Sequence, residues 1–326
     1  MYCEFGRHTR RTQAFGDFRL QRPRTAPHRG VAALTCAQAT RRVRPAWRAP
    51  LSSEGLTGYV EFMGSTRDAA ETSASSPVSL GRVFTDPTVA RLYERRPPYP
   101  EGVFAALARR LVVPGHVLDA GAGTGALARR MTSFAERIDA VEPSAEMLAE
   151  GKQLPGGSDP RIRWIEGRAE DSQLDPPYGL IACGESLHWM DLAVVLPRFR
   201  AALAPGAYLA IVGNANVHGP YREEVWAVTD RYAAVAKHPE TADAIAGVRA
   251  SALFAIEGEE RTDPMSFEQS VDEYIEFLHS TSVLTRAQLG DRVESFDAEV
   301  RAVFARRRIN RLRYEVVGSV TWAVPR

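Results

Sequence analysis

Three glycines alternate with other residues in the stretch 117–126, Val-Leu-Asp-Ala-Gly-Ala-Gly-Thr-Gly-Ala, directly after an acidic side chain. The acid is Asp119, and the glycines are Gly121, Gly123 and Gly125. The apolar residues before the turn indicate the end of a buried strand, and those after it begin a helical pattern. Glycines at a strand-to-helix turn let the backbone approach a ligand closely, and the first N–H groups of the helix can bind polar or anionic groups. The spacing predicts a ligand-binding turn; the alternative is an ordinary turn that carries three glycines.

Two ligand classes fit these glycines. Gly121, Gly123 and Ala126 satisfy the looser dinucleotide fingerprint, in which the third position is Gly or Ala. Asp119 points elsewhere, because a carboxylate at the end of the strand repels a pyrophosphate but suits a ligand with a cationic amine. The run resembles motif I of the class I S-adenosylmethionine (SAM) methyltransferases, whose pattern is apolar, acid, apolar, Gly-x-Gly-x-Gly. The resemblance implies that SAM is the cofactor and that its contacts include Asp119, Gly121, Ala122, Gly123 and Gly125.

A second acid, Glu142, ends the next predicted strand, about twenty residues beyond the glycines. A carboxylate there can accept hydrogen bonds from both hydroxyls of a ribose, a device that dinucleotide and SAM folds share. The run that starts at Pro143 resembles the Pro-Ser-x-x-Met-Leu segment of the same methyltransferases, which implies that Met147 flanks the adenine. Packing in a helix core is an equally good interpretation of Met147.

Residues 93–100, Tyr-Glu-Arg-Arg-Pro-Pro-Tyr-Pro, resemble the Tyr…Arg-Pro-x-Tyr-Pro leader of small-molecule methyltransferases similar to trans-aconitate methyltransferase. In that group, which belongs to methyltransferase type 11, an N-terminal helix closes over the cofactor. The resemblance implies that Tyr93 and Arg96 face SAM. The alternative is that Tyr93 packs in the core and the prolines only turn the chain.

Two further segments are expected at the same site. After a predicted third strand, Ala169 and Glu170 are candidate adenine contacts, although Arg168 stands where the family usually has an acid. After the fourth strand, which ends at Gly184, the sequence resembles the family's His-Trp-Phe-Asp run and places His188 and Trp189 near the methyl donor. His188 is then a general base or a polar wall, the alternative being a structural hydrogen-bonding histidine; Trp189 is expected to shape the substrate pocket.

The tetrapeptide Asp-Pro-Pro-Tyr at 175–178 matches a motif with which amino-group DNA methyltransferases hold a flipped base. In those enzymes it follows the fourth strand, whereas here it precedes the predicted strand at 179–183. We therefore interpret it as a loop.

The order of predicted elements indicates an α/β fold, a doubly wound Rossmann-like sheet. The resemblance implies seven strands with the last one, near 320–324, antiparallel. We expect the methyltransferase domain to span residues 81–326. It would include a helical insertion or lid over about 217–310, with a short strand near 267–271.

Composition bounds the remaining possibilities. Residues 1–62 hold 11 arginines and 4 acids, whereas residues 63–326 carry 30 basic and 36 acidic residues. The larger part therefore lacks the basic footprint of a nucleic-acid binder. The wide spacing of the three cysteines indicates neither a metal site nor a disulfide framework, and Cys183 is expected to be a core residue. With no apolar run of about 20 residues and no secretory signal, we expect a cytoplasmic monomer or homodimer without membrane contact.

The first 80 residues are expected to be a disordered leader, since they lack apolar periodicity. An organellar transit peptide is one interpretation of the Arg-rich stretch. We favour the other, that it is translated upstream of a true start at Met63.

Together these features predict a SAM-dependent methyltransferase that acts on a small molecule at a carboxylate, hydroxyl or amine. A carboxylate needs only a cationic clamp, for which Arg222 and Arg286 are candidates, whereas a phenol or amine needs proton removal, for which His188 is the candidate. The alternatives are an NAD(P)-binding oxidoreductase and a SAM-binding protein without catalysis.

Overall fold

The computed structural model describes residues 82–217, 219, 221–233 and 240–326 of the 326-residue chain. The leader predicted for residues 1–80 lies outside these residues. The described strands form an eight-stranded sheet in the order β3-β2-β1-β4-β5-β8-β6, with β7 also paired to β8. The strand bounds are β1 His116–Ala120, β2 Arg137–Glu142, β3 Ile162–Glu166, β4 Tyr178–Gly184, β5 Leu203–Val217, β6 Phe254–Arg261, β7 Met265–Ser270 and β8 Arg311–Pro325.

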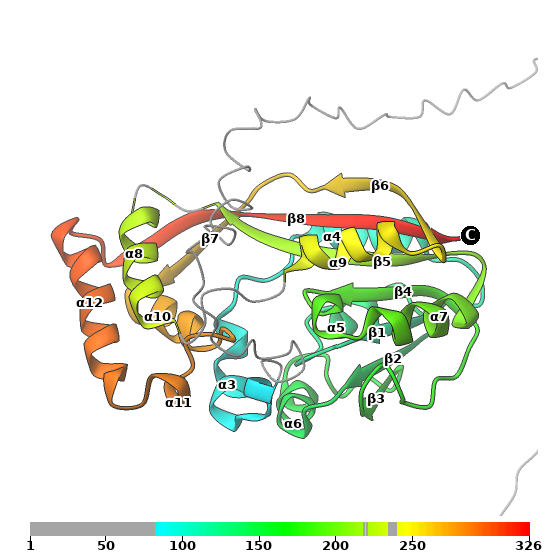
Figure 1. Ribbon diagram of the computed structural model, residues 1–326, viewed down its shortest axis with the longest axis horizontal. Helices are drawn as coiled ribbons and strands as arrows, with labels where there is room; N and C mark the ends of the chain where they lie inside the picture. The colour runs from blue at the N-terminus through cyan, green and yellow to red at the C-terminus, as the bar shows by residue number, and fades with distance from the viewer. Residues whose placement is uncertain (1–81, 218, 220, 234–239) are drawn as a thin grey trace, which may run out of the picture. The chain divides into compact units, whose positions relative to one another are not determined.

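Helices cover both faces of the sheet, as expected for a doubly wound fold (Figure 1). Residues that alternate along a strand point to opposite faces, so Val117 packs with the core under α4 and α5, while Leu118 packs with the core under α7. The helix bounds are α3 Pro87–Leu92, α4 Glu101–Arg110, α5 Ala128–Met131, α6 Ala145–Gln153, α7 Leu192–Ala202, α8 Arg222–Tyr232, α9 Thr241–Ala250, α10 Val271–His279, α11 Arg286–Leu289 and α12 Val293–Arg306. None of the helices among these described residues is long and apolar enough to cross a membrane.

The parallel half of the sheet positions the predicted ligand site. β1, β2, β3, β4 and β5 run parallel, so their carboxyl ends meet at one edge. The strand order reverses between β1 and β4, and open α/β sheets bind ligands in the crevice at such a point. The loop interpretation of residues 175–178 is confirmed for its first three residues, with Tyr178 opening β4, and Cys183 is buried as expected.

The antiparallel half confirms the predicted last strand but adds one strand to the seven expected. β8 is 15 residues long and pairs antiparallel with β5 along one side. On its other side, β6 pairs with residues 319–325 and β7 with residues 311–316, so two short strands succeed each other along one edge. They are separated at 262–264, where Pro264 has no N–H to donate. The expected short strand near 267–271 is β7, whereas β6 was not predicted.

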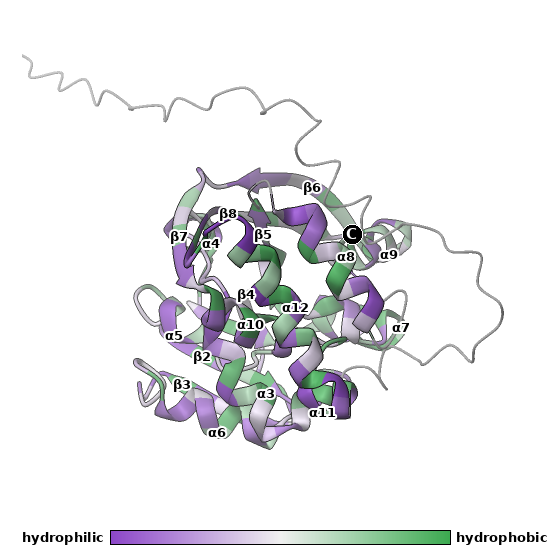
Figure 2. Cartoon of the chain, turned by 90° about the vertical axis from the view of Figure 1, so that its left-hand side faces the viewer, coloured by the Kyte–Doolittle hydropathy of each residue, from purple (hydrophilic) through white to green (hydrophobic). Residues whose placement is uncertain are grey.

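The insertion predicted as one helical lid divides between two cores. Buried residues of α9 and β6, such as Val248 and Phe254, belong to the core of the sheet. Helices α8, α10 and α12 instead form a separate core with the first half of β8. This core includes Phe296 and Phe304 of α12. We call α8, β7, α10, α11 and α12 the lid. Its helices carry hydrophobic residues on one side and hydrophilic residues on the other (Figure 2).

The N-terminal segment, residues 82–100, closes the site from the remaining side. Asp86 caps α3 by accepting a hydrogen bond from the Thr88 N–H at 2.7 Å, and Pro87 occupies the first helical position, where its missing N–H is not needed. Val89 and Ala90 of α3 pack against Met147 of α6. The segment therefore lies over the ends of β1 and β2.

Candidate active site

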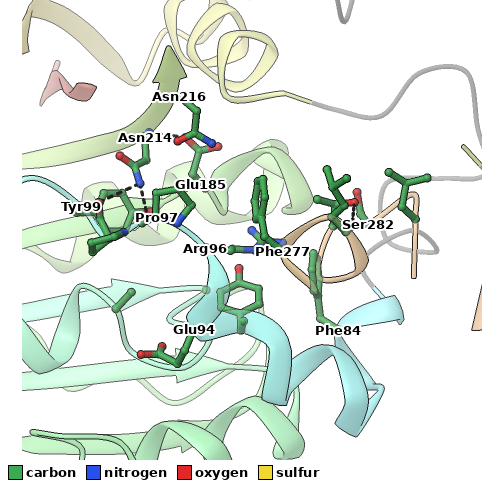
Figure 3. A pocket seen from close by; sticks show the side chains of 18 of the residues that line it. Phe84, Glu94, Arg96, Pro97, Tyr99, Glu185, Asn214, Asn216, Phe277 and Ser282 are labelled. Carbon is green, nitrogen blue, oxygen red and sulfur yellow. Dashed lines mark hydrogen bonds between the residues drawn. The ribbon is translucent and has the colours of Figure 1, made fainter. Parts of the chain in front are cut away.

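A cavity of about 670 Å³ opens at the carboxyl edge of the sheet. Its lining comes from the glycine turn and the ends of β4 and β5, from the N-terminal segment, and from α8 and α10 of the lid. Figure 3 shows side chains from these three sources facing one another across the space. The cavity thus brings together residues that are up to two hundred positions apart in the chain.

The glycine turn has the backbone conformation that its sequence predicts. Gly121, Gly123 and Gly125 have φ angles of 72°, 57° and 78°, values that residues with a Cβ atom rarely adopt. The turn's N–H groups bond within the protein: those of Gly121 and Ala122 donate to the Val141 carbonyl at 2.8 and 3.0 Å. These donors hold the turn on β2 and are not directed at a ligand.

Asp119 lines the cavity and also caps the following helix. Its Oδ2 accepts a hydrogen bond from the Ala128 N–H at 3.0 Å. Its side chain is almost fully buried, and this burial raises its pKa from 3.8 to about 7, against the lowering effect of the Ala128 hydrogen bond. The carboxylate therefore occupies the anion-binding position at the start of α5.

Glu142 lies directly behind the turn and braces it. One carboxylate oxygen accepts from the Gly123 N–H at 2.9 Å and the other from the Ser144 N–H at 3.0 Å. Burial raises the pKa of Glu142, and the two backbone hydrogen bonds oppose that rise. Glu142 is not among the residues that line the cavity, so a ribose contact remains a prediction.

Tyr93 and Arg96 both line the cavity, as predicted for residues that face the cofactor. A Cβ atom built on Gly123 would lie 3.5 Å from the Tyr93 ring, so this ring sits directly on the glycine turn. The Arg96 guanidinium stacks 4.0 Å from the centre of that ring and donates to the Ser280 hydroxyl and carbonyl at 3.1 and 2.6 Å. Arg96 thereby joins the N-terminal segment to the end of α10.

The expected adenine contacts do not line the cavity. Met147 is buried under α3, and Pro143 is exposed beside it. Ala169 packs in the sheet core, and Glu170 pairs with Arg168 at 2.9 Å and accepts from the Asp191 N–H at 3.0 Å. Their contact with adenine stays a prediction.

Gly184, the last residue of β4, lines the cavity together with His188 and Trp189 from the segment that follows. The His188 Nδ1 lies 3.4 Å from the Thr241 hydroxyl, and its ring centre lies 4.8 Å from that of Trp189. The two possible clamping arginines are not among the lining residues: Arg222 stacks on Trp226, and Arg286 lies 4.0 Å from the Asp297 carboxylate.

Glu185 is a site residue that the sequence analysis missed. It follows Gly184 at the end of β4 with a φ of 49°, which is unusual for a residue with a side chain. Its carboxylate accepts from the Asn214 N–H at 2.9 Å and from the Thr241 hydroxyl at 3.1 Å. Burial raises its pKa. One sequence signal was available: like Asp119 and Glu142, it is an acid at the carboxyl end of a buried strand.

Asn214, Asn216 and Tyr99 complete this part of the lining and were not predicted either. The Asn214 amide donates to the Pro97 carbonyl at 2.9 Å, which ties β5 to the N-terminal segment. The Oδ1 atoms of Asn214 and Asn216 are buried without a hydrogen-bond partner among the described residues. Burial and the charge of Glu185 both raise the pKa of Tyr99, so its hydroxyl keeps its proton.

Comparisons with known proteins find that the glycine turn lies in a segment that matches a protein family. Residues 117–206 match the family described as a methyltransferase domain. Uncharacterised methyltransferases of Mycobacterium tuberculosis and Mycobacterium bovis are each 34% identical over 128 residues, which is 37% of this chain and 49% of the relative. The chain thus spans about half the length of the curated relatives it matches.

Similar solved structures include that of a candidate type II methyltransferase from Anaeromyxobacter dehalogenans. It has 23% identity and a TM-score of 0.49, over 71% of this chain and 97% of that one. A SAM-dependent methyltransferase from Thiobacillus denitrificans in complex with S-adenosylhomocysteine has 16% identity and a TM-score of 0.45, over 75% of this chain and 98% of that one. The family match at residues 117–206 thus includes the glycine turn and Asp119 before it, and it extends through β4 to the start of β5.

Proposed function

We propose that this protein transfers a methyl group from SAM to a small-molecule acceptor held beneath the lid. The observation that carries the proposal is the cavity that joins the glycine turn, with Asp119 at its base, to the lid helices. The segment at residues 93–100 supports a relationship to methyltransferases similar to trans-aconitate methyltransferase, because both Tyr93 and Arg96 line that cavity.

The residues of the turn fit SAM better than a dinucleotide. A pyrophosphate needs free N–H groups and the start of a helix, but here the N–H groups of Gly121, Ala122 and Gly123 are bonded to protein oxygens. The N–H of Ala128 is bonded to the Asp119 carboxylate, which would repel a phosphate. The same carboxylate suits the ammonium group of SAM. The Arg96 guanidinium suits the carboxylate of SAM, since its hydrogen-bond partner Ser280 and its stacking partner Tyr93 are both neutral.

SAM, when bound, supplies an electrophilic methyl group. The contribution of the chain would then be to hold the acceptor in line and to exclude water. Aromatic side chains of the lid, Trp226, Tyr274 and Phe277, line the cavity and suit an apolar body in the acceptor.

Two features support a small acceptor over a nucleic acid. The net charge of residues 63–326 is −6, which opposes the approach of a polyanion. The Tyr178 ring, which would hold a flipped base in the DNA-methyltransferase interpretation, is instead buried, and its hydroxyl donates to the Asp139 carboxylate at 2.5 Å. Its tetrapeptide also precedes β4 and does not follow it.

Calorimetry with SAM, S-adenosylhomocysteine and NADH tests the cofactor, and we expect the first two to bind and NADH not to bind. Transfer of labelled methyl groups from SAM to small metabolites, to total nucleic acid and to protein then tests the acceptor. We expect label in the small metabolites. Label confined to a macromolecular pool refutes the small-molecule acceptor, and binding without any transfer indicates a SAM-binding protein without catalysis.

A further inference from the structure

The end of β4 and the adjoining part of β5 carry a group of hydrogen-bond acceptors that the SAM site does not use. It consists of the Glu185 carboxylate and the side-chain oxygens of Asn214 and Asn216, and we call it the acceptor cluster. Figure 3 shows the three side chains together at one end of the cavity. Both hydrogen-bond donors to Glu185, the Asn214 N–H and the Thr241 hydroxyl, are neutral. The charge of Arg96 lowers the pKa of Glu185, but burial has the larger effect, and among the described residues Arg96 forms no ion pair with it.

The position of the cluster along the sheet separates it from the cofactor. The strand order β2-β1-β4-β5 places Glu142, Asp119, Glu185 and Asn214 in sequence across the carboxyl edge. Neighbouring strands lie about 4.8 Å apart, so Glu185 lies about 10 Å from the end of β2, where the ribose is expected. A cofactor whose ribose lies at Glu142 and whose ammonium group lies at Asp119 carries its sulfonium methyl group between these two points. Glu185, on the next strand, and the space over β5 are then left for the acceptor.

The chemistry of the cluster favours a donor with a positive charge. A buried acceptor oxygen without a donor is destabilising, and a ligand N–H that reaches it, after a small rotation of the amide, removes that penalty. A carboxylate in a cavity attracts a cation more strongly than in water, because the surroundings screen it less. An acidic acceptor is disfavoured at the same place, because its oxygens would face Glu185 and two amide oxygens.

We propose that the acceptor cluster binds the protonated nitrogen of an amine and that this amine is the methyl acceptor. The inference rests on the proposed SAM-dependent function. An ammonium nitrogen has no free electron pair, so it must lose a proton before it can take a methyl group. The N–H bond breaks, its electron pair stays on nitrogen, and the proton forms an O–H bond with a Glu185 carboxylate oxygen. The ion pair becomes a neutral amine beside a neutral carboxyl group.

Two observations agree with this role for Glu185. Burial raises its pKa, which brings its affinity for a proton closer to that of an amine. Its backbone is held at a φ of 49°, a conformation that costs free energy and is often found at functional sites. His188, the base candidate from the sequence, is linked to Glu185 through the Thr241 hydroxyl, which lies 3.4 Å from the His188 Nδ1.

Three probes that share a phenyl ring and a two-carbon arm test the inference: 2-phenylethylamine, 2-phenylethanol and 3-phenylpropionate. Their affinities are measured by calorimetry for the full chain saturated with S-adenosylhomocysteine. We expect the amine to bind at least tenfold more tightly than the alcohol or the acid. Glu185→Gln, which keeps the size and one acceptor oxygen, should reduce amine binding at least tenfold and leave S-adenosylhomocysteine binding within threefold.

Asp230→Asn is the matched control, because Asp230 is a carboxylate on the lid side of the same cavity, outside the cluster. It should change amine affinity by less than twofold. Preference for the alcohol or the acid, binding of none of the probes, or equal losses in both variants overturns the inference. If S-adenosylhomocysteine itself fails to bind, the proposed function fails, whatever the probes do.

Discussion

Three acids end three neighbouring strands of this sheet, and their surroundings give them different tasks. Asp119 lies near the end of β1 and caps α5, Glu142 ends β2 and braces the glycine turn, and Glu185 follows β4 and faces the cavity. Burial raises the pKa of all three. The three carboxylates differ in the hydrogen-bond donors around them. These donors determine which carboxylate oxygen is left to bind a ligand.

The pKa of Asp119 predicts how stability depends on pH. Because its pKa is about 7 in the folded chain and 3.8 ordinarily, the folded state holds the proton more tightly between these values. The free energy of unfolding should therefore fall as pH rises from about 4 to 7, by up to about 4 kcal/mol, since each pKa unit corresponds to about 1.4 kcal/mol. Urea unfolding at several pH values measures this, and Asp119→Asn should show a shallower dependence over the same range.

Ligand binding should respond to Asp119 in the opposite sense. If the ionised carboxylate holds the ammonium group of S-adenosylhomocysteine, affinity should rise about five- to tenfold between pH 6 and pH 8, as the ionised fraction rises. Asp119→Asn keeps an oxygen to accept from Ala128 but cannot ionise, so its affinity should change little over that range. Calorimetry at both pH values decides this, and an equal pH dependence in both proteins would assign the effect to another group.

Glu142 predicts a binding loss that exceeds the structural loss. Glu142→Ala removes the acceptors for Gly123 and Ser144 and, if the ribose lies there, two more hydrogen bonds worth about 1.5–3 kcal/mol each. S-adenosylhomocysteine should bind at least tenfold more weakly. Glu142→Gln keeps one acceptor oxygen, so its affinity for S-adenosylhomocysteine should lie between that of the wild type and that of Glu142→Ala. Unchanged affinity in a folded Glu142→Ala protein would show that the ribose binds elsewhere.

At the scale of elements, the turn between β1 and α5 is held by its own hydrogen bonds before any ligand arrives. Its N–H groups reach Val141, Glu142 and Ala122, so the turn is fixed to β2 and to itself. Three residues with positive φ make this path possible. The ligand would then approach the turn's surface without needing its donors.

Two glycine substitutions should separate fold from binding in this element. A Cβ at Gly125 would lie 2.4 Å from the Trp164 ring, whereas a Cβ at Gly123 would meet Tyr93 at an ordinary 3.5 Å. Both carry the backbone cost of about 1–2 kcal/mol for a left-handed residue, but only Gly125→Ala must also displace a packed tryptophan. Thermal melting should show the larger loss for Gly125→Ala. Gly123→Ala should melt closer to the wild type and still lose cofactor affinity; equal melting losses would contradict the role of Trp164.

At the scale of the whole molecule, the cavity is closed by contacts between segments that are distant in sequence. Arg96 joins the N-terminal segment to Ser280 at the end of α10, and Asn214 of β5 joins the same segment at Pro97. β8 links the sheet to the lid, because the second half of β8 pairs with β6 and its first half pairs with β7, which belongs to the lid. Closure of the site therefore depends on the N-terminal segment and the lid together.

Arg96→Ala should loosen both closing parts at once. Its side chain is partly buried, bonds Ser280 and stacks on Tyr93, so its removal should raise hydrogen exchange in residues 87–96 and 271–284 and weaken S-adenosylhomocysteine binding about tenfold. Arg95 is the control, because it pairs at the surface with Glu273 and Glu276 of α10, the helix whose C-cap residue is Ser280. Exposed pairs are worth about 1 kcal/mol or less. Arg95→Ala should change exchange and affinity much less, and similar effects from both variants would count against the special role of Arg96.

The sequence by itself determined the parts of this protein that depend on local patterns. The glycine turn, the acids of β1 and β2 and the alternation of strands and helices could be predicted, because glycine conformation and burial patterns act over a few residues. These features were enough to indicate a doubly wound fold and a SAM-type turn.

Only the tertiary structure decided which residues share the cavity. Glu185 becomes a site residue because β5 and α9 supply its hydrogen-bond donors, and Asn216 because the cavity opens beside its strand. The sharing of one edge of β8 by β6 and β7 likewise depends on pairing between distant segments. Such pairings are long-range, and the side-chain pattern of a single strand does not specify which neighbour it will meet.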